Sequence, residues 1–311
     1  MSDNNRHYDQ LNSVEAIPLL SPSLRGPLEE AVSEYQEREW RVSRANDMSD
    51  FACHPCAILG NDSLAVFAKY GAGPDAAKQF EVEQAGLQYL AENTGVLIPT
   101  LIGIVPVTNG TLFIMEALNA IERRPLQWRQ IGKTLARIHR VKSDRCGFDR
   151  DNYFGPLEQD NTPIQNWATF YGQRRLWPRL RMAIEADNIP SSVASQVEMV
   201  IKRLPELCGP EIGPTLVHGD AQQNNFISTA TGTFVIDPAI YYGNPEIDLA
   251  FIDYFQPVPD DLFAGYSEER PIDSGFFARR DLWRISGYLA AVAVEGSAYL
   301  GRLTNALQRY L

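Results

Sequence analysis

The sequence predicts an α+β fold of two lobes, with a small strand-rich lobe in residues 1–118 and a larger, mostly helical lobe in residues 119–311. Three observations lead to this prediction. Apolar runs separated by turn signals fill the chain up to Leu118, apolar residues at helical spacing follow, and one island of strands interrupts those helices. With 311 residues, 44% of them hydrophobic, the chain is long enough for two joined lobes with a sizeable core.

The clearest element of the first lobe is a β-hairpin. The apolar runs Cys56–Leu59 and Leu64–Lys69 flank Gly60-Asn-Asp-Ser63, which is a typical turn between strands. The polar first twenty or so residues are expected to be loosely ordered. The other elements expected in this lobe, in chain order, are a polar helix over about 23–39, a helix over about 76–92, and strands over 101–105 and 111–115.

Helical periodicity dominates the second lobe. Ile131, Leu135 and Ile138 recur at i, i+4 and i+7, which predicts an amphipathic helix over 128–141. The other elements expected in this lobe are helices over 164–186, 191–204 and 279–310, and strands over 215–218, 226–228 and 233–236.

Charge and composition limit the possible partners. The formal net charge of −11 argues against a nucleic acid or an anionic membrane surface, because phosphate binding needs clustered positive charge. Met1–Gln10 lacks the basic flank and apolar core of a signal peptide, and Tyr288–Val294 is too short to cross a bilayer. Four cysteines do not make a disulfide scaffold. We therefore expect a cytoplasmic protein with a small-molecule partner, and the oligomeric state is left open.

The strand island carries the predicted chemistry. His218-Gly-Asp220 follows an apolar strand, Asn225 comes five residues after Asp220, and Asp237 follows the next strand pair. Phosphoryl transfer on a kinase-like scaffold needs one aspartate to accept the proton of the attacking hydroxyl, and an asparagine and a second aspartate to hold Mg²⁺. Gly-Asp and Asn-Asn pairs also occur as ordinary turn residues, but the D-x4-N spacing matches the kinase catalytic loop. Asp220 is therefore the predicted catalytic base, and Asn225 and Asp237 are the predicted ligands of Mg²⁺.

A kinase also needs a strand lysine for the phosphates of ATP and a helical glutamate that positions it. Lys69 lies in the second hairpin strand. Glu83 lies at i+3 from Phe80 and i−4 from Leu87, which mark the inward face of its helix. An inward carboxylate requires a partner, and Lys69 is the candidate placed to meet it. The alternative is a snorkelling lysine at the sheet edge, with Glu83 at the boundary of the core.

The adenine of ATP is expected at the connection between the lobes. By position, the backbone groups of Met115 and Ala117, at the end of the last strand of the first lobe, would read the adenine edge. Such contacts use main-chain groups and so do not depend on the side chains present. An ordinary strand end is the alternative.

Eight further stretches follow one another in a recognisable order. They are Phe67-Ala-Lys69, Phe80-Glu-Val-Glu83, Cys146-Gly-Phe148, Asp151–Gly155, Gln159-Asp-Asn161, Trp167–Phe170, Ile236–Gly243 and Glu246–Ala250. In order and spacing they resemble the fructosamine (ketosamine) kinase family, a branch of the aminoglycoside-phosphotransferase-like kinases. The resemblance covers about residues 50–300 and implies a two-lobed protein-kinase-like fold. It also implies ATP and Mg²⁺ as cofactors, and transfer of the γ-phosphoryl group to a sugar hydroxyl.

The resemblance assigns roles residue by residue. The positions that match the family's functional residues are Lys69, Glu83, Asp220, Asn225 and Asp237. Glu246 and Asp248 match the acidic pair that follows the metal aspartate in the family, for which the resemblance implies mainly structural support.

Three stretches depart from the family pattern. Residues 47–56 stand where the family has a glycine-rich phosphate loop, and they contain no glycine. Ala221-Gln-Gln-Asn224 replaces Leu-Trp-Ser-Gly after the catalytic aspartate. Gly287 and Tyr288 lie in the last helix, where the family favours a Tyr-His and Asn-His pattern near the sugar pocket. We therefore expect Gln222, Gly287 and Tyr288 at the acceptor site, and the acceptor need not be a ketosamine.

Together these features predict an ATP- and Mg²⁺-dependent small-molecule kinase that acts on a hydroxyl of a sugar-like acceptor, either a ketosamine or a related amino sugar. A protein kinase fits poorly, because the eight residues between Asp237 and Glu246 leave no room for an activation segment. The alternatives are an aminoglycoside-type phosphotransferase and a catalytically silent nucleotide-binding module. The glycine-free loop favours the silent module.

Overall fold

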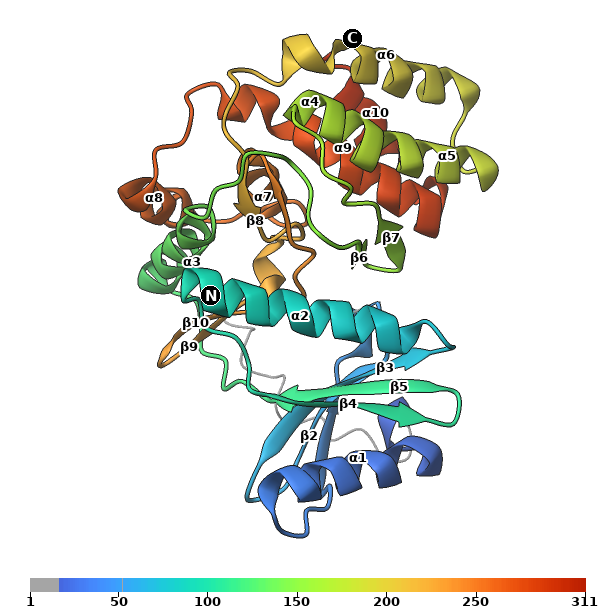
Figure 1. Ribbon diagram of the computed structural model, residues 1–311, viewed down its shortest axis with the longest axis vertical. Helices are drawn as coiled ribbons and strands as arrows, with labels where there is room; N and C mark the ends of the chain where they lie inside the picture. The colour runs from blue at the N-terminus through green and yellow to red at the C-terminus, as the bar shows by residue number, and fades with distance from the viewer. Residues whose placement is uncertain (1–16, 52) are drawn as a thin grey trace, which may run out of the picture. The chain divides into compact units, whose positions relative to one another are not determined.

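The structure is a computed structural model that describes residues 17–51 and 53–311. Residues 1–16, part of the stretch expected to be loosely ordered, lie outside the described residues. The chain forms two compact units, which Figure 1 traces. The first consists of the described residues up to Ala85 together with Ile98–Ala120, and the second consists of Gly86–Leu97 and Ile121–Leu311. The helix α2, Ala76–Thr94, gives its N-terminal half to the first unit and its C-terminal half to the second.

The first unit is built on a five-stranded antiparallel sheet in the order β1-β2-β3-β5-β4. The helix α1, Pro22–Gln36, covers one face of this sheet, and the N-terminal half of α2 lies on the other face (Figure 1). The strands are β1 Arg44–Asp47, β2 Cys56–Gly60, β3 Ala65–Ala72, β4 Leu101–Val107 and β5 Gly110–Glu116.

The alternation of β3 decides which of its side chains meet α2. Val66 and Ala68 are buried in the apolar cluster that includes α1, so Lys69 points to the opposite face. On that face the ring of Phe80, from α2, packs 5.6 Å from the ring of Phe113. β3 is the central strand of the sheet, and Lys69 is therefore not an edge lysine.

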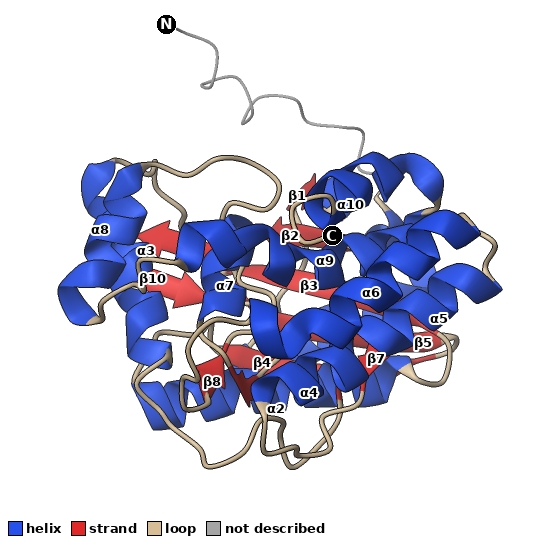
Figure 2. Ribbon diagram, turned by 90° about the horizontal axis from the view of Figure 1, so that it is seen from above, coloured by secondary structure: helices blue, strands red, loops and turns tan. Residues whose placement is uncertain are grey.

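The second unit is mostly helical, as the colours of Figure 2 show. It also has the short antiparallel strand pairs β6–β7, β8–β11 and β9–β10. Its helices are α3 Pro125–Ile138, α4 Trp167–Phe170, α5 Trp177–Glu185, α6 Ser191–Leu207, α7 Glu246–Phe251, α8 Asp260–Glu269, α9 Phe276–Glu295 and α10 Leu300–Leu307. Its strands are β6 Asn152–Phe154, β7 Leu157–Gln159, β8 Thr215–Val217, β9 Phe226–Thr229, β10 Gly232–Val235 and β11 Tyr241–Gly243.

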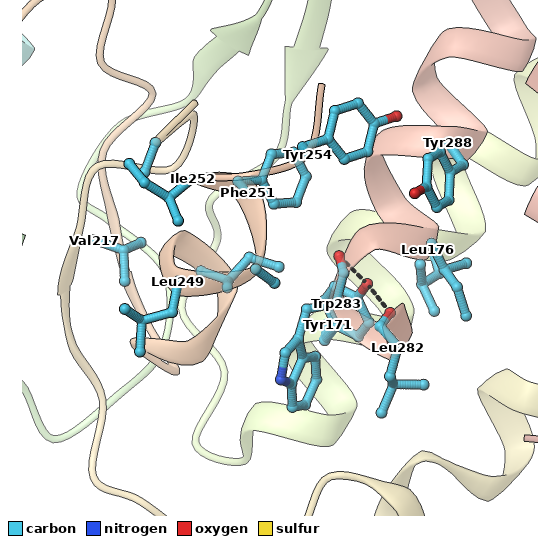
Figure 3. Close-up of a cluster of buried hydrophobic side chains, with 14 of the residues drawn as sticks. Tyr171, Leu176, Val217, Leu249, Phe251, Ile252, Tyr254, Leu282, Trp283 and Tyr288 are labelled. Atoms are coloured by element: carbon cyan, nitrogen blue, oxygen red, sulfur yellow. Dashed lines mark hydrogen bonds between the residues drawn. The ribbon is translucent and has the colours of Figure 1, made fainter. Parts of the chain in front are cut away.

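An apolar core that includes residues of the turn Tyr171–Leu176, of α7 and of α9 holds this unit together (Figure 3). Trp283 of α9 and Leu249 of α7 are almost completely buried in it. The hydroxyl of Tyr171 lies in the same core, 2.8 Å from the carbonyl oxygen of Leu282, so its polar end is satisfied by the backbone of α9.

Two of the expected helices differ in detail from the structure. The helix expected over 279–310 is interrupted, because Gly296 adopts a φ of 85° and separates α9 from α10. The helix expected over 164–186 contains a π-helical turn, Tyr171–Leu176, just before Pro178. In the described part of the chain, no helix is both long and apolar enough to span a membrane.

Two glycines allow α3 and α8 to pack closely. A Cβ on Gly132 would overlap the carbonyl oxygen of Leu262, and a Cβ on Gly265 would overlap that of Arg129. The neighbouring atoms are backbone and cannot rotate away. The close approach matters for the site described below, because it brings the end of α3 against Tyr266 of α8.

We predict that Gly265→Ala destabilises the protein by about 1–3 kcal/mol, since the added methyl group forces the two helices apart. Gly301→Ala on α10 is the matched control. Among the described residues, no atom beyond its chain neighbours and its own helix backbone lies within 4 Å of its added Cβ, and alanine favours a helix, so stability should stay the same or rise. Urea unfolding measures both. Equal stability of the two variants would contradict the proposed close packing.

Candidate active site

The buried carboxylate of Asp248, in the first turn of α7, holds the segment His218-Gly-Asp220 in place. Its Oδ2 accepts the backbone N–H of His218 at 2.6 Å, and its Oδ1 accepts that of Gly219 at 3.0 Å. Nε2 of His139, at the end of α3, lies 3.0 Å from Oδ2. Asp248 is 1% exposed, so these contacts replace water around a charge that would be unstable if buried alone.

His218 links the segment that carries Asp220 to the segment that carries Asp237. Its Nδ1 accepts the backbone N–H of Asp220 at 3.3 Å, so the ring proton is on Nε2, which donates to the carbonyl of Ile236 at 2.9 Å. Burial lowers the pKa of His218, which favours this neutral form. His218 therefore orients the loop and does not act as the base.

Gly219 is needed for the same arrangement. It has a φ of 82°, and a Cβ there would overlap the carbonyl oxygen of Ala239. The N–H of Ala239 donates to the carbonyl of His218 at 2.8 Å. The segment that follows Asp237 thus packs directly against the segment that carries Asp220.

Asp220 and Asn225 lie together in the loop. Nδ2 of Asn225 donates to the backbone carbonyl of Asp220 at 2.8 Å and lies 3.4 Å from its Oδ2. Nε2 of Gln222 also lies 3.4 Å from Oδ2 of Asp220. Burial, and then the negative charge of Asp237, raise the pKa of Asp220 to about 7. A carboxylate of this basicity suits proton transfer near neutral pH.

Asp237 has a φ of 52°, a left-handed conformation that is uncommon for an aspartate. Such strain costs about 1–3 kcal/mol and persists where the surrounding structure enforces it. Nδ2 of Asn225 donates within the loop, so the amide oxygen is the atom of Asn225 that would bind a cation, and the carboxylate of Asp237 would be a second ligand. Hard oxygen ligands of this kind, few in number, fit Mg²⁺.

In the first unit, Lys69 and Glu83 form an ion pair, with Nζ 2.8 Å from Oε1. The side chains are only 7% and 14% exposed. The pairing holds the ammonium group away from bulk solvent on the face of the sheet toward α2. Its role in binding ATP stays a prediction.

The sheet engages some of the backbone groups of Met115 and Ala117. Met115 lies in β5 between Phe67 of β3 and Leu101 of β4. The N–H of Ala117 donates to the carbonyl of Ala65 at 3.0 Å. Of the groups expected to read an adenine, this N–H is therefore already used.

The three residues expected at the acceptor site come from two elements, the loop after Asp220 and the helix α9. Gln222 lies beside Asp220. Gly287 is buried, and a Cβ there would come within 2.9 Å of Phe251 and 3.1 Å of Tyr254. The ring of Tyr288 packs 4.9 Å from that of Tyr254 (Figure 3). Gly287 thus packs against aromatic rings, and the assignment of Gln222, Gly287 and Tyr288 to the acceptor site stays a prediction.

Several partners of the site were not evident from the sequence. His139 Nδ1 lies 2.8 Å from the hydroxyl of Tyr266, far away along the chain. Glu246 accepts Nη2 of Arg279 at 2.6 Å and Nε1 of Trp283 at 2.8 Å. These contacts join α3, α7, α8 and α9, and no local spacing signals them.

Comparison with known proteins fits this geometry. Residues 27–311 match the family model described as fructosamine kinase. The chain belongs to the fructosamine kinase family. As a member of this family, it is a phosphotransferase that acts on the hydroxyl of a sugar-like acceptor.

Individual relatives agree with the family assignment. A probable ketoamine kinase of Vibrio parahaemolyticus is 30% identical over 71% of this chain and 77% of its own length. The ketosamine-3-kinase of Mus musculus is 27% identical over 79% of this chain and 88% of its own. A crystal structure of a candidate fructosamine-3-kinase from Thermobifida fusca has a TM-score of 0.79 at 27% identity, covering 91% of this chain and 98% of that one.

Proteins outside the family share this fold. A thermostable mutant of the aminoglycoside phosphotransferase APH(4)-Ia has a TM-score of 0.56 at 13% identity, covering 90% of this chain and 98% of its own. At this identity the likeness concerns the fold alone, which is the protein-kinase-like fold of these phosphotransferases.

We predict that Asp248→Asn destabilises this fructosamine kinase family member by about 2–4 kcal/mol and also lowers its turnover. An amide offers one acceptor oxygen where the carboxylate offers two, so buried donors of His218, Gly219 or His139 lose their partner. Glu206→Gln on α6, where the side chain is 75% exposed, is the control and should change stability by less than about 0.5 kcal/mol. Urea unfolding at neutral pH measures both, and a stable Asp248→Asn variant would disprove the anchoring role.

Proposed function

We propose that the protein transfers the γ-phosphoryl group of ATP, in the presence of Mg²⁺, to a hydroxyl of a ketosamine or a related amino sugar. The observation that carries this proposal is the pair Asp220 and Asn225, hydrogen-bonded within a loop that Asp248 anchors. The loop geometry agrees with the D-x4-N spacing of kinases. The family and its ketosamine kinase relatives support the class of acceptor.

Each group then has a defined task. Asp220 accepts the proton of the attacking hydroxyl, and Asn225 and Asp237 hold Mg²⁺ through their side-chain oxygens. Lys69, positioned by Glu83, pairs with the phosphates of ATP. The bound cation supplies charge neutralisation at the phosphate oxygens.

Gln222 places an amide group beside the proposed catalytic base. Its amide lies 3.4 Å from the carboxylate of Asp220, so a hydroxyl that approaches Asp220 also meets an amide donor and acceptor. A site that hydrogen-bonds a hydroxylated acceptor penalises analogues without the matching hydroxyl, because its own polar groups would stay unpaired. The net charge of −11 is compatible with an amine on that acceptor.

A catalytically silent nucleotide-binding module is the rival proposal, supported by the absence of glycine from residues 47–56. Phosphate transfer from Mg·ATP to a panel of sugars, ketosamines and aminoglycosides distinguishes the two. The panel also distinguishes a ketosamine kinase from an aminoglycoside-type phosphotransferase, which the shared fold makes a relevant comparison.

We predict that Asp237→Ala abolishes Mg²⁺-dependent ATP binding and leaves the fold intact, because it removes the charged metal ligand. Calorimetric titration with Mg·ATP measures the affinity. Asp62→Ala, at a fully exposed hairpin turn, is the control and should bind normally. Unchanged Mg·ATP affinity in Asp237→Ala would exclude this residue as a ligand.

Asp220→Asn should lower kcat by about a hundredfold or more with little change in the KM for the acceptor, because an amide cannot accept the proton in the transition state. Steady-state kinetics on an accepted sugar from the panel measures both constants. Near-normal kcat in this variant would remove Asp220 from the role of base.

A further inference from the structure

Arg123, in the segment that leads into α3, contacts the turn that carries Asn225. Its Nη2 donates to the carbonyl oxygen of Gln223 at 3.0 Å and to that of Phe226 at 2.7 Å. The first carbonyl lies two residues before Asn225 in the chain, and the second lies one residue after it. One guanidinium group therefore bridges both ends of the turn that holds a proposed ligand of Mg²⁺.

Two neighbouring contacts fix the position of Arg123 itself. The N–H of Ile121 donates to the carbonyl of Ser228 in β9 at 2.9 Å, so the segment before α3 lies against β9. The guanidinium carbon of Arg123 lies 5.1 Å from the centre of the Trp128 ring on α3, and an aromatic ring attracts a cation at this distance. Arg123 thus reaches the turn from a backbone that is bound to β9, and with its charged end packed against an aromatic ring.

Arg123 keeps its charge in this place. Burial lowers the pKa of its guanidinium, yet an arginine is not deprotonated at neutral pH in a protein. In the described part of the chain no carboxylate forms an ion pair with Arg123, so its charge acts on the two carbonyls. Hydrogen bonds from a charged donor are roughly twice as strong as those between neutral groups. Arg123 therefore holds the turn more firmly than a neutral donor would.

The contacts of Asn225 itself are with main-chain groups. Its N–H donates to the carbonyl of Gln222 at 2.9 Å, and its own carbonyl accepts the N–H of Ile236 at 3.0 Å. Its Nδ2 donates to the carbonyl of Asp220 at 2.8 Å. Asn225 is 4% exposed, so its side chain has little freedom to turn. The direction of its amide oxygen therefore follows from the position of the turn, and Arg123 fixes that position.

Arg123 and Asp248 hold opposite ends of the same loop with opposite charges. The carboxylate of Asp248 accepts the backbone N–H groups of His218 and Gly219, where the loop begins. The guanidinium of Arg123 donates to two backbone carbonyls where the loop ends. Removal of Arg123 leaves the hydrogen bonds of Asp248 in place and frees only the turn around Asn225. The loss of Arg123 should therefore affect the binding of the cation more than it affects the proposed base.

We propose that Arg123 is a positioning residue for the binding of Mg²⁺. It fixes the carbonyls of Gln223 and Phe226 and thereby sets the direction of the Asn225 amide oxygen, and it acts on the cation only through Asn225. This inference rests on the proposed function, in which Asn225 binds Mg²⁺. Removal of a residue that orients a metal ligand typically weakens metal binding or activity by about 10- to 100-fold.

The test measures how much Mg²⁺ the protein needs to bind a nucleotide. Calorimetry follows the binding of AMP-PNP, an ATP analogue that resists hydrolysis, to the full-length protein over a range of Mg²⁺ concentrations. Arg123→Met removes the donors and keeps an apolar side chain against Trp128. It should raise the Mg²⁺ concentration for half-maximal binding by about tenfold or more and leave the binding measured without Mg²⁺ unchanged.

Two further variants separate positioning from a general loss of structure or charge. Arg123→Lys keeps the charge on a single nitrogen, so its Mg²⁺ requirement should lie between those of wild type and Arg123→Met. Arg137→Met removes the same charge from an exposed position of α3 and should behave as wild type. Thermal melting without Mg²⁺ checks the folding of each variant. If Arg123→Met does not fold, Arg123→Lys decides, since a raised Mg²⁺ requirement supports the proposal and an unchanged one overturns it.

The outcomes distinguish the role of Arg123 from the proposed function. An unchanged Mg²⁺ requirement in folded Arg123→Met would overturn the positioning role, and so would an equal loss of binding with and without Mg²⁺, or an equal shift in Arg137→Met. AMP-PNP binding by wild type that needs no Mg²⁺ would overturn both this role and the proposed function. A raised Mg²⁺ requirement in Arg123→Met, with no phosphorylated product from the acceptor panel, would support the role of Arg123 and count against the proposed transfer.

Discussion

The carboxylate of Asp248 is the interaction on which the rest of the second unit's site depends. One buried side chain satisfies two consecutive backbone N–H groups, of His218 and Gly219, and also meets His139. A loop normally lies at the surface because its backbone polar groups need water. Here a charge supplied by α7 replaces that water, so the loop can be buried and still be held in a single conformation. The position of Asp220 follows from this anchoring.

Those parts of the site that depend on local spacing could be predicted from the sequence. Lys69 and Glu83 are brought together by the period of a strand and the period of a helix, and the structure pairs them at 2.8 Å. Asp220 and Asn225 are five residues apart, so a short loop brings their side chains together. The hairpin β2–β3 and the helix α3 could be predicted for the same reason, because their turn residues and apolar periodicity lie within the element itself.

Features set by distant packing could not be predicted in the same way. β1 consists of Arg-Ala-Asn-Asp and has no apolar alternation, and only its pairing with β2 makes it a strand. Gly287 packs against the rings of Phe251 and Tyr254, which come from another part of the chain and could not be identified from the sequence of α9.

The carboxylates of the second unit differ in how they are compensated, and the difference bears on function. Asp248 and Glu246 are compensated by the protein itself, through backbone N–H groups in one case and through Arg279 and Trp283 in the other. Asp220 is approached by the amides of Gln222 and Asn225, which stabilise a charge less than an opposite charge does. Folding gains little from a half-buried carboxylate of this kind. The proposed function would give this carboxylate its missing partners, a hydroxyl proton and a nearby cation.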